Sequence, residues 1–388
     1  MHPSPALTPS RTPTRSPALT GALSLTGART RALTGALSRA LSRTGARTGA
    51  LTLTLTFTLT LVLAPRPAAA NGQSTHVAIS LDALTRLPEG PVADLLRRPE
   101  LRTMLVNGTM FPDWGYASGD RDHGEACHWE PFQQTFLRQI QANYSAPYTD
   151  SIAAELVAFL FGMVSHGIAD EHFDSLFMER SRLRDPGWQD PDAASLDTAS
   201  DVLYMAAIGG IGNPDRWLPT DALAAAFAVA MPDQPLDVAG MEWGHTLLHV
   251  AVDAVEALRT DPERVAAFTA LYPWSTEHLT SPDMPGAPPT EADVVALTWL
   301  RLWDRLQGTA DFDPPVAMMT PAPGSYAHAL DAATPEARVH LSFAHGVRAD
   351  SLSLVTVADA DGADVPVQVG LFYGDRSHAT LIRPEQDW

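Results

Sequence analysis

The chain has 388 residues, of which 45% are hydrophobic and 18% charged, which is typical of a globular protein with a sizeable core and room for two domains. All 26 basic residues are arginine. Residues 1–70 contain eight of them and no acidic residue, so residues 71–388 contain 18 basic and 45 acidic residues. A surface this acidic argues against binding along nucleic acid or on anionic lipid, and the single cysteine, Cys127, excludes an intrachain disulfide.

Residues 1–70 have the features of an export signal. A long tract rich in threonine, alanine, leucine and arginine precedes the apolar run LTLTLTFTLTLVLA, and three alanines, Ala68 to Ala70, follow. A basic region, an apolar region and small residues at a cleavage position make up a secretory signal. The apolar run is too short and too rich in threonine for a membrane span. We therefore expect a secreted or periplasmic protein with no transmembrane anchor.

The next part of the chain has the periodicity of helices. Apolar residues recur at spacings of three and four, and clusters such as RDPGWQDPD separate the periodic stretches. The predicted helices span residues 80–87, 91–98, 132–144, 151–177, 201–210, 221–231, 245–259 and 291–306. We expect one all-α domain over residues 74–308.

The character of the sequence changes after PPVAMMTPAPG. The stretches VHLSFA, LSLVTV and VPVQVGLFY are rich in β-forming residues, with turns such as YGDRS between them. Residues 320–388 are therefore expected to form a small Ig-like β-sandwich, with fewer strands than a complete sandwich contains.

The predicted helix 151–177 carries an unusual set of polar residues. His166, Asp170 and Asp174 follow one another at intervals of four, which places them on one face of a helix. Such groups are costly on an apolar face unless something compensates them, and a metal ion does so well. The alternative is a polar helix end that meets solvent or backbone.

Four stretches, STHVAI, MFPDWGY, CHWEPF and VAFLFGMVSHGIAD, resemble in order and separation the zinc-dependent phospholipase C family. Within that family they look most like the catalytic domain of glycosylphosphatidylinositol-specific phospholipase D. The resemblance extends roughly over residues 74–308, and it implies a phospholipase C-like helical bundle with zinc ions at one end. The ligands implied by the resemblance are His76, Asp113, His128, His166 and Asp170, the last bridging two metals.

The residue types agree with that implication. Two residues on one helix and three from separate segments can complete a shell of nitrogen and oxygen ligands that suits zinc. In such a site the metals lower the pKa of a bound water, hold a hydroxide near phosphorus and neutralise charge on the phosphoryl oxygens. No serine or cysteine nucleophile is needed. Asp113 is also a candidate catalytic residue, accepting a proton from the attacking water.

The chain departs from the family at the third metal. The family has a histidine where this chain has Asp174, and a later histidine and acid align with Ala193 and Asp197. His172 is a poor substitute because helical geometry points it away from Asp174. Asp174, Asp192, Asp197 and Asp201 could together hold a harder ion such as calcium or magnesium, or the third site is empty. We expect two zinc ions and an altered or absent third metal.

Further candidates have two interpretations each. His245 and His249 repeat the spacing of four and are either a second metal site or hydrogen-bonded histidines on a helix face. Trp114, Tyr116 and Trp129 flank the implied ligands and either line a lipid or choline pocket or pack behind the site.

The expected function is therefore a secreted metal-dependent phosphodiesterase, of phospholipase C or D type, acting on phospholipid or a lipid-linked head group at a membrane surface. No nucleic-acid partner is expected. Two alternatives stay open. One is a single-strand-specific nuclease of the same superfamily, and the other is a non-catalytic binding or adhesion protein with a decayed metal centre.

The signal generates a prediction about the mature chain. Because three alanines precede Asn71, cleavage should leave Asn71 at or near the N-terminus of the exported protein. Mass spectrometry of intact material recovered from outside the cytoplasm checks this. An exported species that retains the threonine-rich tract would contradict it.

Overall fold

The computed structural model describes residues 71–309 and six strand segments at 318–320, 339–342, 357–358, 363–365, 368–371 and 378–382. The predicted export signal, residues 1–70, lies outside the described residues. Within 71–309 the regular structure is helical, so the predicted all-α bundle is confirmed for this range.

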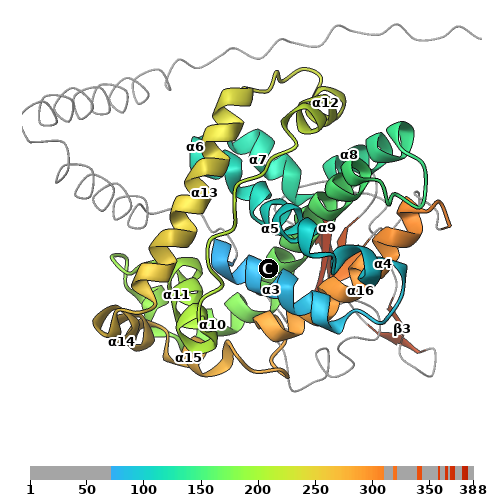
Figure 1. The fold of residues 1–388 in the computed structure, drawn as a ribbon. Coiled ribbons are helices and arrows are strands. Elements are labelled where there is room, and N and C mark those ends of the chain that lie inside the picture. Colours follow the sequence, from blue (N-terminus) through green and yellow to red (C-terminus); the bar gives the residue numbers. More distant parts are fainter. Residues whose placement is uncertain are drawn as a thin grey trace, which may run out of the picture. The chain divides into compact units, whose positions relative to one another are not determined.

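The helices follow one another along the chain, and a longer connection separates α11 from α12 (Figure 1). The α-helices are α3 Gln73–Arg86, α4 Pro91–Leu96, α5 Arg102–Met110, α6 Trp114–Ser118, α7 Arg121–His128, α8 Glu130–Asn143, α9 Ser151–His172, α10 Glu179–Arg184, α11 Leu196–Ile208, α12 Thr220–Ala230, α13 Val238–Leu258, α14 Pro262–Leu271, α15 Pro273–His278 and α16 Pro288–Leu306. Shorter turns are the 3₁₀ segments η1 Pro99–Leu101, η2 Phe111–Asp113 and η4 Pro186–Gln189, and the π-helical segment η3 Phe173–Met178.

Helix α9 is the central element of the bundle. It contacts α3, α5, α8 and α16, and nearly all its residues after the first turn are buried (Figure 1). Its first turn is capped by Asp150, whose carboxylate accepts a hydrogen bond from the Ala153 N–H at 3.0 Å. The stretch Ser151–Arg184 is long and apolar enough to cross a membrane, but 89% of its most apolar window is buried among the other helices. Its apolar character is therefore accounted for by burial in the core.

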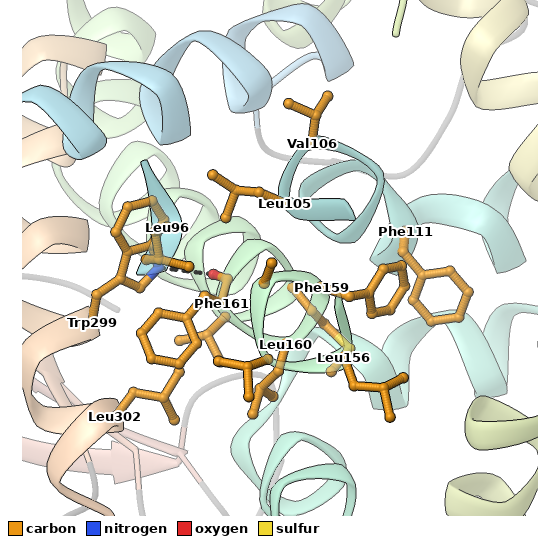
Figure 2. Close-up of a cluster of buried hydrophobic side chains, with 14 of the residues drawn as sticks. Leu96, Leu105, Val106, Phe111, Leu156, Phe159, Leu160, Phe161, Trp299 and Leu302 are labelled. Carbon is orange, nitrogen blue, oxygen red and sulfur yellow. Dashed lines mark hydrogen bonds between the residues drawn. The ribbon is translucent and has the colours of Figure 1, made fainter. Parts of the chain in front are cut away.

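Large side chains of α4, α5, η2 and α16 pack around those of α9 in the core (Figure 2). Phe159 and Phe161 of α9 pack between Phe111 on one side and Trp299 of α16 on the other. The Trp299 indole N–H donates to the Phe161 carbonyl at 2.8 Å, so this large ring is buried without an unpaired donor.

Helices α5 and α9 approach each other unusually closely because two glycines face the partner backbone. A Cβ on Gly108 would lie 2.1 Å from the Phe159 carbonyl oxygen, and one on Gly162 would lie 2.0 Å from that of Leu105. No side chain fits in either gap. This contact fixes the spacing of the two helices just before the residues that form the candidate site.

Two helix boundaries differ from the prediction in ways that matter for the site. Helix α3 begins at Gln73 rather than near residue 80, so His76 lies on a helix. The reason is long-range: the Asp201 carboxylate of α11 accepts hydrogen bonds from the backbone N–H groups of Ser74 and Thr75 at the start of α3. Secondly, α9 ends at His172 and continues as the π-helical segment Phe173–Met178.

The described strands form a four-stranded antiparallel sheet in the order β1-β2-β6-β5, and a separate pair β3-β4. Their bounds are β1 Met318–Thr320, β2 Val339–Ser342, β3 Val357–Ala358, β4 Asp364–Val365, β5 Gln368–Leu371 and β6 His378–Ile382. Most of residues 320–388 lies outside the described residues, and the Ig-like sandwich stays a prediction.

The close helix contact can be tested by adding one methyl group. Gly162→Ala would place a Cβ against the Leu105 carbonyl, so we expect the free energy of unfolding to fall by about 1–3 kcal/mol. Gly240→Ala in α13 is the control, because its Cβ would meet only the flexible Asp237 carboxylate. Urea unfolding followed by circular dichroism measures both. Equal stability of the two variants would contradict the packing argument.

Candidate metal centre

Three histidines and two aspartates from four separate segments meet inside the bundle. His76 comes from α3, Asp113 from η2, His128 from the end of α7, and His166 and Asp170 from neighbouring turns of α9. The three imidazoles are almost completely buried. The structure therefore brings together the five residues that the sequence analysis put forward as zinc ligands.

The Asp170 carboxylate lies at the middle of this cluster. Its Oδ1 is 3.0 Å from His76 Nε2, while its Oδ2 is 3.3 Å from His166 Nε2 and 3.5 Å from His128 Nε2. Asp113 Oδ1 approaches the same two histidines, at 3.3 Å from His128 Nε2 and 3.8 Å from His166 Nε2. The two oxygens of Asp170 thus face different histidines.

Backbone carbonyls determine which nitrogen of each ring faces inward. His166 Nδ1 lies 2.8 Å from the Thr109 carbonyl, and His128 Nδ1 lies 2.9 Å from the Gly124 carbonyl. Because a carbonyl only accepts, each Nδ1 carries a proton and each Nε2 presents its lone pair to the cluster. These two Nε2 atoms are 3.1 Å apart. Two lone pairs at this distance require a cation, either a proton or a metal ion, between them.

The donor set fits zinc. Ligand atoms about 2.0–2.2 Å from a tetrahedral zinc lie about 3.3–3.6 Å from one another, close to the separations within this cluster. Two groups of three could each hold an ion: His76, His166 and Asp170 form one, and Asp113, His128 and His166 form the other. Nδ1 of the buried His76 makes no hydrogen bond within the described residues, and its Nε2 faces Asp170 Oδ1, its partner in the first of these groups.

The charges within the cluster shift the pKa values in a consistent pattern. Burial lowers the pKa of His76, and the nearby His166 lowers it further, so His76 is neutral. Burial alone would raise the pKa of Asp170, but His166 and His76 hold it far below its usual range. Burial also opposes the charged form of His128, yet the hydrogen bond to Asp113 and the charge of Asp170 raise its pKa to about 9. Without metal, His128 therefore carries the proton that the facing lone pairs require.

Two predicted residues, Asp174 and Asp197, lie outside both three-residue groups among the described side chains. Asp174 falls in the π-helical segment, where hydrogen bonds span five residues and a spacing of four no longer keeps side chains in line. Asp201, a further aspartate considered for the third metal, caps α3 with both of its oxygens. Its role in the structure is therefore that of a helix cap.

The aromatic neighbours of the cluster divide into two kinds. Trp114 is fully buried and packs against Phe111 and Phe227, so it belongs to the core. Tyr116 and Trp129 are partly exposed beside the His128 ring, at 5.4 and 6.1 Å between ring centroids. Their hydroxyl and indole N–H groups both donate to the Glu125 carboxylate. These two rings therefore lie between His128 and solvent-exposed surface and do not belong to the core.

Sequence reasoning did not identify two buried residues next to the cluster. The Gln73 amide donates to Asp113 Oδ2 from the first turn of α3, and its position three residues before His76 was the available signal. Glu291 of α16 is fully buried and accepts two hydrogen bonds from the Asn71 amide, at 3.0 and 3.2 Å. Burial raises its pKa well above the usual range, and the charges of Asp170 and Asp174 add to that effect.

The second histidine pair is a hydrogen-bonded structural unit. His245 Nε2 and His249 Nε2 both contact Asn107 Oδ1, at 2.8 and 3.0 Å, and His249 Nδ1 contacts Asn213 Oδ1 at 2.8 Å. The pair joins α13 to α5 and to the loop before α12. Of the two interpretations offered for this pair, the geometry agrees with the hydrogen-bonded one.

Comparison with known proteins supports the resemblance found in the four motifs. Residues 75–172 match the family model described as zinc dependent phospholipase C, a range that includes all five clustered residues and ends before Asp174. Proteins named phosphatidylinositol-glycan-specific phospholipase D are similar in sequence. The bovine protein is 37% identical over 131 residues, and the rat and human proteins are 36% and 37% identical over 123 residues. The predicted resemblance of this region to the family is confirmed.

These matches cover a limited part of each protein. The alignment with the bovine protein spans 31% of this chain and 15% of that protein. The alignments with the rat and human proteins each span 30% of this chain and 14% of the relative. No solved structure matches the chain significantly.

The protonation of His128 predicts how metal binding depends on pH. A zinc ligand must be neutral imidazole, so binding near neutral pH must displace the proton from His128, whose metal-free pKa is about 9. The pKa values of His76, Asp113 and Asp170 are all shifted downwards, so these groups have no proton to lose. The zinc association constant should rise about tenfold per pH unit between pH 7 and 9.

Isothermal titration calorimetry in buffers of different ionisation enthalpy measures the number of protons released at each pH. His128→Ala is the control and should remove this proton release. Binding with no proton release at pH 7 would contradict the assignment of the proton to His128.

Proposed function

From the match of residues 75–172 to the zinc-dependent phospholipases C, we propose that this protein is a secreted, metal-dependent phosphodiesterase that hydrolyses phospholipids or lipid-linked head groups. The single observation that carries the proposal is the buried cluster of three histidines and two aspartates, with Nε2 lone pairs directed inward by backbone carbonyls. Its donors suit zinc, and zinc suits phosphodiester hydrolysis.

The five clustered residues would hold two ions. His76 and Asp170 Oδ1 lie on one side of the cluster and Asp113 and His128 on the other. His166 has one inward lone pair and would bind one of the two ions, while Asp170 Oδ2 faces both His166 and His128. Bound zinc would supply Lewis acidity, lowering the pKa of a water molecule and offsetting negative charge on a phosphoryl group.

The protein's own residues supply orientation and proton transfer. Thr109 and Gly124 carbonyls fix the His166 and His128 rings, so these ligands need no rearrangement as a substrate enters. Asp113 is the proposed proton acceptor. The neighbouring His166 and His128 keep its pKa below the usual range against the effect of burial, so it is ionised, which both a metal ligand and a proton acceptor must be.

The proposal for the third metal is that it is altered or absent. Asp174 and Asp197 are its proposed ligands and carry oxygen only, which favours a harder and more readily exchanged cation than zinc. The family match also ends before both residues. Two tightly held zinc ions are therefore proposed.

Three further features belong to the same proposal. Residues 1–70 direct export, residues 74–308 form the catalytic domain, and residues 320–388 form a small Ig-like module. Whether cleavage is of C type, releasing diacylglycerol, or of D type, releasing phosphatidic acid, is decided by identifying the lipid product. The relatives' printed name, phosphatidylinositol-glycan-specific phospholipase D, makes a glycosylated phosphatidylinositol one of the substrates to include.

A pair of aspartate variants tests the proposal. Asp170→Ala removes the carboxylate that faces both metal positions, so we expect hydrolysis of phosphatidylcholine or phosphatidylinositol vesicles to fall by about 1,000-fold or more. Asp174 lies outside both groups, so Asp174→Ala should reduce activity less than about tenfold. Lipid products are quantified by mass spectrometry, and bound zinc by atomic emission.

Single-stranded DNA is assayed in parallel. Hydrolysis of DNA but of no lipid would favour the nuclease alternative, and zinc-free protein inactive on every substrate would favour the binding-protein alternative. Equal, complete loss of activity in both variants, with three tightly held zinc ions in the parent, would contradict the proposed third site.

A further inference from the structure

Besides His76, the first turn of α3 directs a second polar side chain at the metal cluster. Gln73 precedes His76 by three residues, and residues three apart share a helix face. Gln73 is 7% exposed, and its Nε2 donates a hydrogen bond to Asp113 Oδ2. Helix α3 therefore contacts the cluster twice, once through a histidine and once through an amide that holds an aspartate.

The two oxygens of the Asp113 carboxylate have different partners. Oδ2 is held by Gln73, whereas Oδ1 faces His128 Nε2 at 3.3 Å and His166 Nε2 at 3.8 Å. An aspartate carboxylate rotates easily about its last torsion, because that torsion has only broad minima. A donor fixed on one oxygen restricts that rotation and keeps the other oxygen directed at the two histidines.

The free acceptor of Gln73 argues against a purely structural role. Its Oε1 is buried and has no hydrogen-bond partner within the described residues. Leaving a buried acceptor unpaired costs about 1–3 kcal/mol, a cost that an apolar side chain of the same length would avoid. The amide is therefore explained by the bond that it donates to Asp113.

The start of α3 does not depend on Gln73. Asp201 accepts hydrogen bonds from the backbone of Ser74 and Thr75 and from the Thr75 hydroxyl, at 2.7–3.2 Å, and Asn71 is bound to Glu291. Loss of the Gln73 amide should therefore leave His76 in place. Its effect on the metal centre can be separated from an effect on folding.

We propose that Gln73 is a positioning residue that orients Asp113 for metal binding and for proton transfer. The inference rests on the proposed function, since it takes Asp113 as a ligand and proton acceptor. It assigns Gln73 no contact with metal or phosphate. Its effect passes through the orientation of Asp113.

The test compares two buried glutamines, each of which donates to a carboxylate. Gln73→Met in the full chain keeps the side-chain length and removes the donor, and zinc affinity should fall about 10–100-fold. The control is Gln134→Met in α8, since Gln134 is 5% exposed and donates to Glu130 Oε1 at 2.9 Å. Competition with a fluorescent chelator measures zinc affinity, thermal unfolding measures stability, and initial rates on phosphatidylcholine vesicles give kcat and KM.

The proposal is supported if Gln73→Met weakens zinc binding and lowers kcat with little change in KM, while Gln134→Met preserves both and loses comparable stability. It is overturned if Gln73→Met binds zinc as the parent does, or if both variants lose zinc equally. Should Gln73→Met not fold, Gln73→Asn, which retracts the amide by one methylene, is judged by the same criteria. If the parent binds zinc but hydrolyses no substrate, the proposed function fails, while the zinc measurement still decides the role of Gln73.

Discussion

The candidate site depends on the close contact between α5 and α9. His166 can reach the Thr109 carbonyl, 2.8 Å away, because Gly108 and Gly162 let the two helix backbones touch one turn earlier. That one hydrogen bond determines the tautomer of His166 and hence which nitrogen faces the cluster. The geometry of the metal ligands is therefore set by backbone packing in the core, where no metal ligand is involved.

A buried group of hydroxyls reinforces the same contact. Ser80 of α3 lies 2.9 Å from the Thr109 hydroxyl and 2.6 Å from the Ser165 hydroxyl, and Ser165 also donates to the Gly162 carbonyl. Each of these residues is next to, or one turn from, a residue of the site. Helices α3, α5 and α9 are thus joined by hydrogen bonds within one turn of the clustered residues, which limits their movement relative to one another.

The sequence was informative where a local pattern decides the outcome. Apolar spacing predicted α9 and α16, and the spacing of four placed His166 and Asp170 on one face of a helix. The sequence pattern did not predict features that depend on residues distant in the chain. Helix α3 starts early because Asp201, more than a hundred residues away, caps it, and no local signal marks this. The short polar helix α7 also lacked the apolar periodicity on which the prediction relied, although it carries His128.

The π-helical segment is a second feature that the sequence pattern did not predict. A spacing of four predicted that Asp174 would continue the face of His166 and Asp170, but the helix changes its hydrogen-bond pattern at Phe173. Gln73 was missed for the opposite reason. Its position relative to His76 was visible, but its partner Asp113 is 40 residues further along the chain.

Four segments that are far apart in the chain supply the clustered residues, and this has a consequence for folding. A zinc ion bound there would connect α3, η2, α7 and α9 as a cross-link does, and would stabilise the folded form in proportion to the logarithm of its free concentration. Since an unfolded chain cannot assemble the same five side chains, unfolding would release the metal, and removal of the metal would lower the free energy of unfolding. A chelator would therefore make this protein easier to unfold by heat or denaturant.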